Sequence, residues 1–220
     1  MKYILVVPDG MADDPLEELD GRTPLEAART PRMDYLAEHG TVGMVRVTPE
    51  SIYPGSDAAN MSLLGYDPLE YYTGRGPVEA AAMEVPMDDH DVAFRCSLVS
   101  SNGSVITDYS AGHVDTAVSR SLIELSKKLL NRAQKFYPGI SYRHIMTWTD
   151  GPIDVLTHAP HENMDRSIQE ILPTGDGESF LRGLIWDSLE LLNDHPYNRQ
   201  RIGDGLSPAN MLWPWGQGRK

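Results

Sequence analysis

The sequence predicts an α/β beginning followed by a compact α+β module, and three observations support this prediction. Residues 3–7 form a short apolar run bounded by turn residues, which is typical of a strand buried on both faces. A helical pattern and a second apolar run follow, as in a β-α-β unit. After about residue 88, two alternating runs flank Ser101-Asn102-Gly103, which indicates a β-hairpin, and long helical patterns follow it.

Composition and charge narrow the possible function classes. The chain has 220 residues, of which 40% are hydrophobic and 23% charged, as in a folded protein with a substantial core. Its formal net charge of −13 argues against a nucleic acid or an anionic membrane as partner. No apolar run reaches the roughly 20 residues that span a bilayer. Cys96 is the single cysteine, so no disulfide can form within the chain and we expect a reducing cytoplasm.

Residues 1–89 are predicted to hold the α/β part. Its clearest helix starts at Pro31 and ends before Gly40, because proline is favoured at the first helical position and glycine just after the last. Only two strands are visible, which is few for a sheet, so we expect the front part of a longer protein. The expected elements are strands at residues 3–7 and 41–49 and helices at residues 31–39, 56–65 and 77–84.

Residues 90–205 are predicted to form the α+β module. The strongest helical pattern covers residues 115–139, where Val118, Leu122 and Leu125 fall on one face. We expect residues 206–220, with their two tryptophans and Gly-rich basic end, to be a connection and not a natural terminus. The other expected elements are a hairpin at residues 88–110, a strand at 141–150 and a helix at 178–194.

Asp9 and Ser56 are the first candidates for chemistry. Asp9 directly follows the predicted strand at residues 3–7, and α/β sheets bind ligands outside the carboxyl ends of their strands. It can bind a metal there, although a turn or helix-cap aspartate is the simpler interpretation. Ser56 lies at the predicted start of a helix, where free N–H groups favour a phosphoryl group. Its hydroxyl is either an ordinary N-cap or a nucleophile that a metal activates.

Histidines and arginines of the later residues form a second group of candidates. A guanidinium fork matches phosphate and carboxylate, so each arginine can clamp an anion, although a structural ion pair is the commoner role. Two of the histidines lie three residues apart in THAPH, but metal-binding histidines need a further ligand of matching geometry. The candidates are Arg75, Arg95, His113, Arg143, His144, His158 and His161.

Several long stretches occur in an order that resembles one family. They include PDGMADDPLEELDGRTPLEAARTPRMDYLAEHG, PGSDAANMSLLGYDPLEYYTGRGPVEAA, DVAFRCSLV, DYSAGH, YRHIM, PHEN and PANMLWPWGQGR. The sequence resembles the archaeal-type cofactor-independent phosphoglycerate mutases, members of the alkaline phosphatase superfamily. The resemblance covers essentially the whole chain, but only about the front half of a typical member.

The resemblance implies a fold and a metal-dependent mechanism. The fold is a partial alkaline-phosphatase-like parallel-sheet core at residues 1–89, with an inserted α+β cap domain at 90–205 and a return segment at 206–220. In this family two divalent cations, usually Mn²⁺ and otherwise Mg²⁺, Zn²⁺ or Co²⁺, serve the reaction. The resemblance implies that Asp9 binds one cation and that Ser56 is both a metal ligand and the phosphoryl acceptor.

The resemblance also implies an activity, the interconversion of 3-phosphoglycerate and 2-phosphoglycerate through a phosphoserine, and thus a small phosphorylated substrate. The expected substrate-binding residues are Arg75, His113, Arg143, His158 and His161. The family's remaining metal ligands follow the cap, so we expect the chain alone to be inactive with an incomplete metal site. The sequence does not indicate the oligomeric state.

Three other interpretations stay open. Some bacterial relatives have been proposed to act as homoserine kinases, although this chain shows no Gly-rich nucleotide cradle. A related metal-dependent phosphatase would release free phosphate and form no isomerised product. The chain can also be a non-catalytic folding or interaction module.

Overall fold

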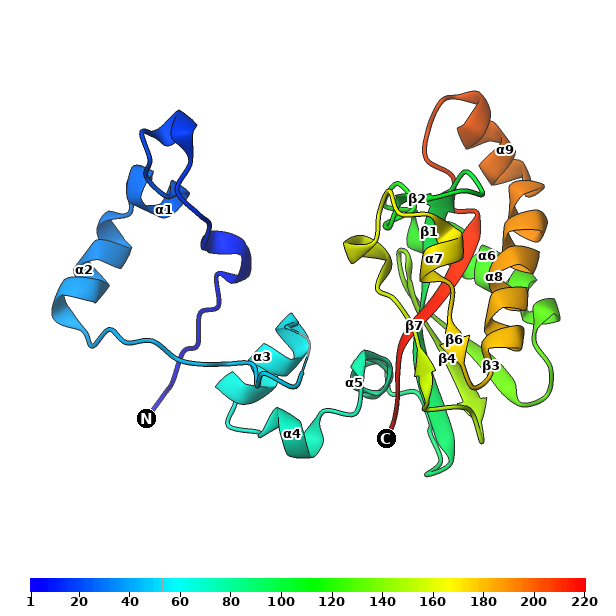
Figure 1. Ribbon diagram of the computed structural model, residues 1–220, viewed down its shortest axis with the longest axis horizontal. Helices are drawn as coiled ribbons and strands as arrows, with labels where there is room; N and C mark the ends of the chain where they lie inside the picture. Colours follow the sequence, from blue (N-terminus) through cyan, green and yellow to red (C-terminus); the bar gives the residue numbers. More distant parts are fainter. Residues whose placement is uncertain (53) are drawn as a thin grey trace. The chain divides into compact units, whose positions relative to one another are not determined.

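The computed structural model describes residues 1–52 and 54–220 and divides into two compact units, Met1–Tyr71 and Tyr72–Lys220. Figure 1 shows the first unit in blue to cyan and most of the second in green to red. This division differs from the predicted domain boundaries. Residues 72–89 and 206–220 belong to the second unit. The helix at residues 75–82 packs on the sheet of this unit, and the strand at residues 211–219 is one of its strands. No helix of the described residues is long and apolar enough to cross a membrane.

The first unit is helical in its regular parts and has little core. Its longest helix starts at Pro31 and ends at His39, next to Gly40, as the sequence predicts. Among the described residues of this unit only Ala58 and Pro68 are buried. The helices are η1 Asp9–Met11, η2 Glu17–Leu19, α1 Pro24–Ala27, α2 Pro31–His39, α3 Ser56–Leu63 and α4 Pro68–Tyr71.

The two strands predicted for the first unit, at residues 3–7 and 41–49, are absent from the structure. Both stretches lack regular structure, and the side chains of Ile4 and Met44 are 89% and 100% exposed. A strand buried on both faces needs neighbouring strands at its edges and cover on each face. Among the described residues of this unit, strand-like pairing is limited to one isolated bridge between Leu16 and Arg22. The prediction was wrong for this unit because an apolar run alone supplies no partner strand.

The second unit is built on an antiparallel sheet with β1 at its centre. β1 pairs with β4 and β7 along its length and with β2 at its end, and β4 pairs with β3. A separate two-stranded ribbon joins β5 and β6. The strands are β1 Asp91–Ser101, β2 Ile106–Asp108, β3 Gln134–Ile140, β4 Arg143–Thr149, β5 Val155–Leu156, β6 Thr174–Gly175 and β7 Met211–Arg219.

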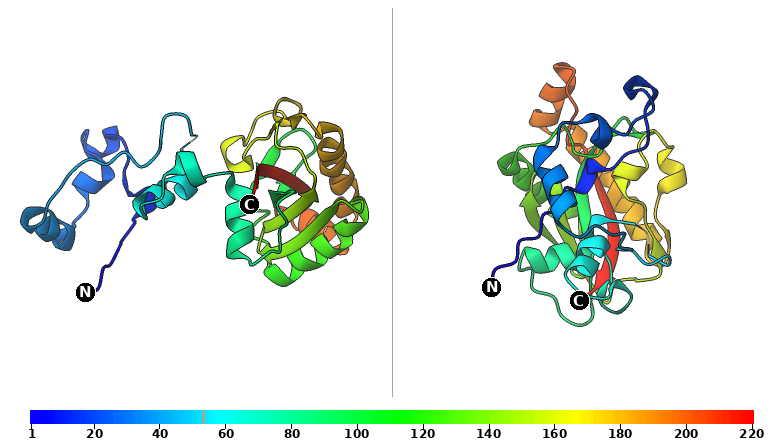
Figure 2. Two further views of the ribbon diagram at one scale, coloured as in Figure 1. Left: turned by 90° about the horizontal axis from the view of Figure 1, so that it is seen from below. Right: turned by 90° about the vertical axis from the view of Figure 1, so that its left-hand side faces the viewer.

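Helices cover both faces of this sheet (Figures 1 and 2). Side chains alternate along β1, so that Phe94, Cys96 and Leu98 pack with buried residues of α6 and α8 on one face. On the other face Ala93 packs with Ala80 of α5. The helices of this unit are α5 Arg75–Ala82, α6 Thr116–Ser126, η3 Lys127–Leu129, η4 Pro160–Glu162, α7 Ile168–Ile171, α8 Glu178–Asn193 and α9 Pro196–Gly203.

The structure confirms part of the predicted order and corrects two elements. The hairpin of β1 and β2, the strand β4 and the helix α8 are confirmed. A single helix was predicted at residues 115–139. The structure has the helices α6 and η3 in the first part of this range and the strand β3 in the last part. Residues 206–220, expected to be a connection, contain β7, which pairs with the central strand.

Candidate anion-binding site

Arg95 lies near the middle of β1 and is almost fully buried, with 4% of its surface exposed. In the sheet it stands opposite Ile145 of β4 and Trp215 of β7. Directly paired residues point to the same face of a sheet, so Arg95 and Trp215 share the face on which α5 packs. A buried guanidinium keeps its charge at neutral pH, and such charges need partners.

Arg75 reaches the same place because α5 lies unusually close to the sheet. Arg75 is the first residue of α5 and is flanked by Gly74 and Gly76. A Cβ on Gly76 would clash with the carbonyl oxygen of Ala93, and one on Gly74 with that of Gln217. Gly74 also has a φ of 144°, which residues with a side chain rarely adopt. The sequence TGRGP is therefore what brings this arginine to the sheet.

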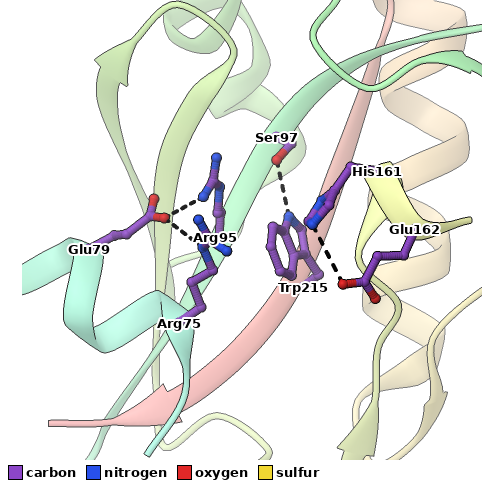
Figure 3. A network of polar contacts seen from close by, with 7 residues as sticks. All are labelled: Arg75, Glu79, Arg95, Ser97, His161, Glu162 and Trp215. Atoms are coloured by element: carbon purple, nitrogen blue, oxygen red, sulfur yellow. Dashed lines mark hydrogen bonds and ion pairs between the residues drawn. The ribbon is translucent and has the colours of Figure 1, made fainter. Parts of the chain in front are cut away.

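Glu79 joins the two arginines. Its Oε1 accepts a hydrogen bond from Arg75 Nε at 2.9 Å, one helical turn away, and another from Arg95 Nη1 (Figure 3). Burial lowers the pKa of Arg95, while the carboxylate of Glu79 opposes that effect and the charge of Arg75 adds to it. Glu79 thus supplies the negative charge that lets two like-charged groups lie together.

Trp215 forms an aromatic wall beside both guanidinium groups. The Cζ atoms of Arg75 and Arg95 lie 5.5 and 5.2 Å from its ring centroid, within the range of cation–π attraction. The indole Nε1–H donates to Ser97 Oγ at 3.1 Å, which fixes the ring (Figure 3). Trp215 is 7% exposed, so its side chain is almost entirely covered.

His161 adds an imidazole from the short helix η4. Its ring centroid lies 5.5 Å from that of Trp215, and its Nε2 lies 3.7 Å from Glu162 Oε1. Burial lowers the pKa of His161; Glu162 opposes this change, and the charges of Arg75 and Arg95 add to it. The imidazole is therefore neutral near pH 7 and offers one donor and one acceptor.

These side chains line a cleft of about 360 Å³. Within the described part of the chain, Arg95 Nε is buried and has no hydrogen-bond partner. Burying a charged donor without an acceptor is costly, so Arg95 is the residue of the cleft whose hydrogen bonds are incomplete among the described residues. The donors present are guanidinium, imidazole and phenol groups, which suit an anion. The lining residues are Arg75, Arg95, Ser97, Tyr109, Tyr142, Pro160, His161 and Trp215.

Two further predicted residues meet at the border of the cleft. The ring of His113 lies 6.5 Å from that of Tyr142, and the Arg143 Cζ atom lies 5.6 Å from the same ring. Both side chains are exposed, and Tyr142 lines the cleft. The structure thus gathers four of the five residues predicted for substrate binding at or around one cleft.

His158 and His144 do not line this cleft. The Nδ1 of His158 lies 3.1 Å from the carbonyl oxygen of Ile171, and its own carbonyl accepts from Trp213 Nε1. His144 is fully buried on β4, where its Nδ1 accepts from the amide of Gly139. Both histidines thus contact other groups of the same domain, which is a structural role.

Sequence reasoning missed Glu79 and Trp215. Glu79 lies four residues after Arg75, a spacing that predicts a helical ion pair and could have drawn attention to it. Trp215 had no such signal, because its place depends on β7, which the sequence did not reveal as a strand.

Asp9 and Ser56 both lie in the unit Met1–Tyr71. Asp9 is the first residue of η1 and Ser56 the first of α3, and both are exposed. The N-cap of α3 is Gly55, so Ser56 is the first residue of the helix and not its N-cap. The described residues contain no group of three or more His, Cys, Asp or Glu that could hold a metal. These residues alone therefore do not fit a two-cation site, and the metal roles of Asp9 and Ser56 stay predictions.

The fold and the cleft together define an α+β domain with a cleft lined by two arginines and a histidine. Comparison with known proteins gives the family. The chain belongs to the 2,3-bisphosphoglycerate-independent phosphoglycerate mutase family, whose model matches residues 37–198.

Individual relatives agree with this assignment. The chain is 47% identical to a probable 2,3-bisphosphoglycerate-independent phosphoglycerate mutase of Geobacter sulfurreducens, covering 100% of this chain and 56% of that protein. It is 48% identical to the enzyme so named in Methanosarcina barkeri, covering 99% and 55%. The chain therefore spans about half the length of the curated relatives it matches.

Two solved structures are similar in fold to this chain. The cofactor-independent phosphoglycerate mutase of Thermoplasma acidophilum matches with a TM-score of 0.55 and 28% identity, over 96% of this chain and 58% of that one. A Pyrococcus horikoshii protein matches with a TM-score of 0.61 and 28% identity, over 96% and 49%.

Proposed function

We propose that the chain is part of a cytoplasmic phosphoglycerate mutase that interconverts 3-phosphoglycerate and 2-phosphoglycerate, and that the arginine cleft binds the substrate. The observation that carries the proposal is the buried, unpartnered Arg95 Nε in a cleft shared with Arg75. The names of the relatives, which are phosphoglycerate mutases, support the choice of substrate. In this proposal the arginines hold the anion by charge-assisted hydrogen bonds, and His161 donates or accepts one more.

Ser56 is the proposed acceptor of the phosphoryl group. It is the first residue of α3, whose N-cap Gly55 has no side chain to cap the first N–H groups, and a helix N-terminus favours a phosphate. Asp9 and Ser56 are proposed ligands of divalent cations, with Mn²⁺ preferred, which would lower the pKa of the serine hydroxyl. Such cations take four to six ligands, so the others would have to come from outside the described residues.

Replacement of Arg95 tests the cleft. Titration of the chain with 3-phosphoglycerate in a calorimeter is expected to show saturable binding, and Arg95→Met is expected to weaken it at least about tenfold, because a charged hydrogen bond is lost. Arg166→Met is the matched control, since Arg166 forms an exposed ion pair with Glu170 outside the cleft. Equal binding by the wild type and Arg95→Met would contradict the assignment of the cleft.

A chimera tests Ser56. The chain alone is expected to stay unphosphorylated with Mn²⁺ and 3-phosphoglycerate, since two ligands are too few to hold the cations. A chimera in which the remaining part of the Methanosarcina barkeri relative continues the chain is expected to isomerise the substrate and to carry phosphoserine at position 56, as read by mass spectrometry. Ser56→Ala should abolish both signals. Full isomerase activity of the Ser56→Ala chimera would refute the role of this serine.

A further inference from the structure

A second cavity, the lysine pocket, lies where η3 leads into β3 and is lined by Lys127, Lys135 and five neighbouring residues. Its volume is about 330 Å³, at the lower end of the range of small-molecule sites, and it shares no lining residue with the arginine cleft. Leu130, Phe136 and Tyr137 form its apolar walls. Phe136 belongs to the core that packs on α6, and Tyr137 packs against the core beside α5. The walls are therefore part of the packed sheet.

The two carboxamide side chains of the pocket have their oxygens occupied and their NH2 groups free. Gln134 is 4% exposed, and its Oε1 accepts from the backbone N–H of Asn131 at 3.2 Å. Asn131 Oδ1 in turn accepts from the N–H of Ala133 at 2.8 Å. Neither NH2 group donates to another of the described residues. The Nε2 of Gln134 is not sealed from solvent, so an acceptor in the pocket can reach it.

Lys127 and Lys135 add positive charge to these donors. Both side chains are exposed, and Lys127 Nζ uses one of its three N–H bonds on Glu124 Oε2, 2.7 Å away. Lys135 forms no ion pair among the described residues. None of the described lining residues is Asp or Glu. Residues 127–135 contain four Lys or Arg and no acidic residue, in a chain whose net charge is −13, so the pocket lies in a local positive field.

A structural role explains only part of this arrangement. β3 is an end strand of the sheet, and lysine on an end strand discourages pairing with another chain, which accounts for Lys135. It does not account for Lys127, which lies on η3, or for an almost fully buried glutamine that leaves its NH2 group unused. A buried amide donor is stabilised when an acceptor meets it, so these residues together favour a ligand with acceptor oxygens.

We infer that the lysine pocket binds a small organic anion that carries an apolar body. The anionic oxygens accept from the two lysines and from the NH2 group of Gln134, and the apolar body lies against Leu130 and Tyr137. The pocket shares no residue with the arginine cleft and includes neither Asp9 nor Ser56, so this inference does not depend on the proposed function.

Three probes test the inference by NMR titration of the chain. Phenyl phosphate has both the charge and the apolar body, inorganic phosphate has only the charge, and benzyl alcohol has only the ring. We expect phenyl phosphate to shift the side-chain NH2 signals of Asn131 and Gln134 and to bind at least about fivefold more tightly than either other probe, because only it uses both the donors and the walls. Unchanged NH2 signals, or equal binding of inorganic phosphate, would overturn the inference.

Adjacent lysines supply a matched pair of variants. Lys127→Gln should weaken phenyl phosphate binding about fivefold, because a charged donor is lost from the pocket. Lys128→Gln removes the same charge from the next residue, which does not line the pocket, and should change the affinity by less than about twofold. Equal weakening by both variants would show a general attraction to the basic segment and would contradict a built site.

Arg95→Met separates this pocket from the arginine cleft. The variant should keep the phenyl phosphate shifts of the Asn131 and Gln134 NH2 signals, since Arg95 does not line the pocket. Loss of these shifts in Arg95→Met would place the bound anion in the arginine cleft and overturn the inference, while leaving the proposed function intact. Retained shifts, together with loss of 3-phosphoglycerate binding, would support two separate anion sites.

Discussion

At the scale of single residues, His144 shows what the sheet requires of a buried polar group. It lies on β4 opposite Cys96 of β1, its Nδ1 accepts from Gly139, and its Nε2 has no partner among the described residues. An imidazole in this position must stay uncharged, and burial, aided by the charges of Arg95 and Arg120, lowers its pKa from 6.5 to about 3. Protonation of this ring therefore destabilises the folded chain.

The pKa of His144 predicts a pH dependence of stability. Between pH 6.5 and about pH 3 the unfolded chain binds a proton at His144 that the folded chain does not, so the free energy of unfolding falls as the pH is lowered through this window. The slope from this residue is at most about 1.4 kcal/mol per pH unit. His144→Asn, whose amide oxygen can accept from Gly139 but does not titrate, should flatten urea-unfolding data from pH 7 to pH 4.

The matched control for this prediction is His90→Asn, because the side chain of His90 is 78% exposed and lies outside the core. It controls for the general effect of replacing a histidine. If His144→Asn and the wild type lose stability with equal slopes below pH 6.5, then His144 is not the group responsible.

At the scale of elements, β3 and β7 show where reasoning from the sequence succeeds and fails. The hairpin, β4 and α8 were predictable because their turn residues and periodicity are local. The end of the helix predicted at residues 115–139 was not, because Leu125, Leu129 and Ala133 continue a helical stripe by chance. In the structure Phe136 is buried in β3, and pairing with β4 outweighs the local pattern. A local pattern carries no information about a partner strand.

The candidate site follows the same rule. Arg75 and Arg95 could be predicted because a guanidinium fork matches an anion, and His161 because of its place in THAPH and the family resemblance. Trp215 could not be, because it meets Arg95 only through the register of β1 and β7, which lie more than a hundred residues apart in sequence. Residue type thus identified the charged groups of the cleft, whereas its aromatic wall depends on tertiary pairing.

At the scale of the whole molecule, the two units differ in how much they bury. The second unit has a sheet with cores on both faces, including Phe94, Ile145 and Trp213, all of them fully or almost fully buried. The first has two apolar runs, residues 3–7 and 41–47, with most side chains exposed. Exposed apolar runs without strand partners gain little from burial, so local opening there costs little free energy.

Amide hydrogen exchange tests this contrast. For the chain in dilute solution, the amides of β1 and β4 should exchange slowly, because each is hydrogen-bonded inside the sheet. The amides of residues 3–7 and 41–47 have no strand or helix partner among the described residues and should exchange within seconds. Protection of residues 3–7 that rises with protein concentration would indicate that a second copy covers them. Protection that does not depend on concentration would contradict the structure, because these amides would then be hydrogen-bonded within one chain, as in the strands that the sequence predicts.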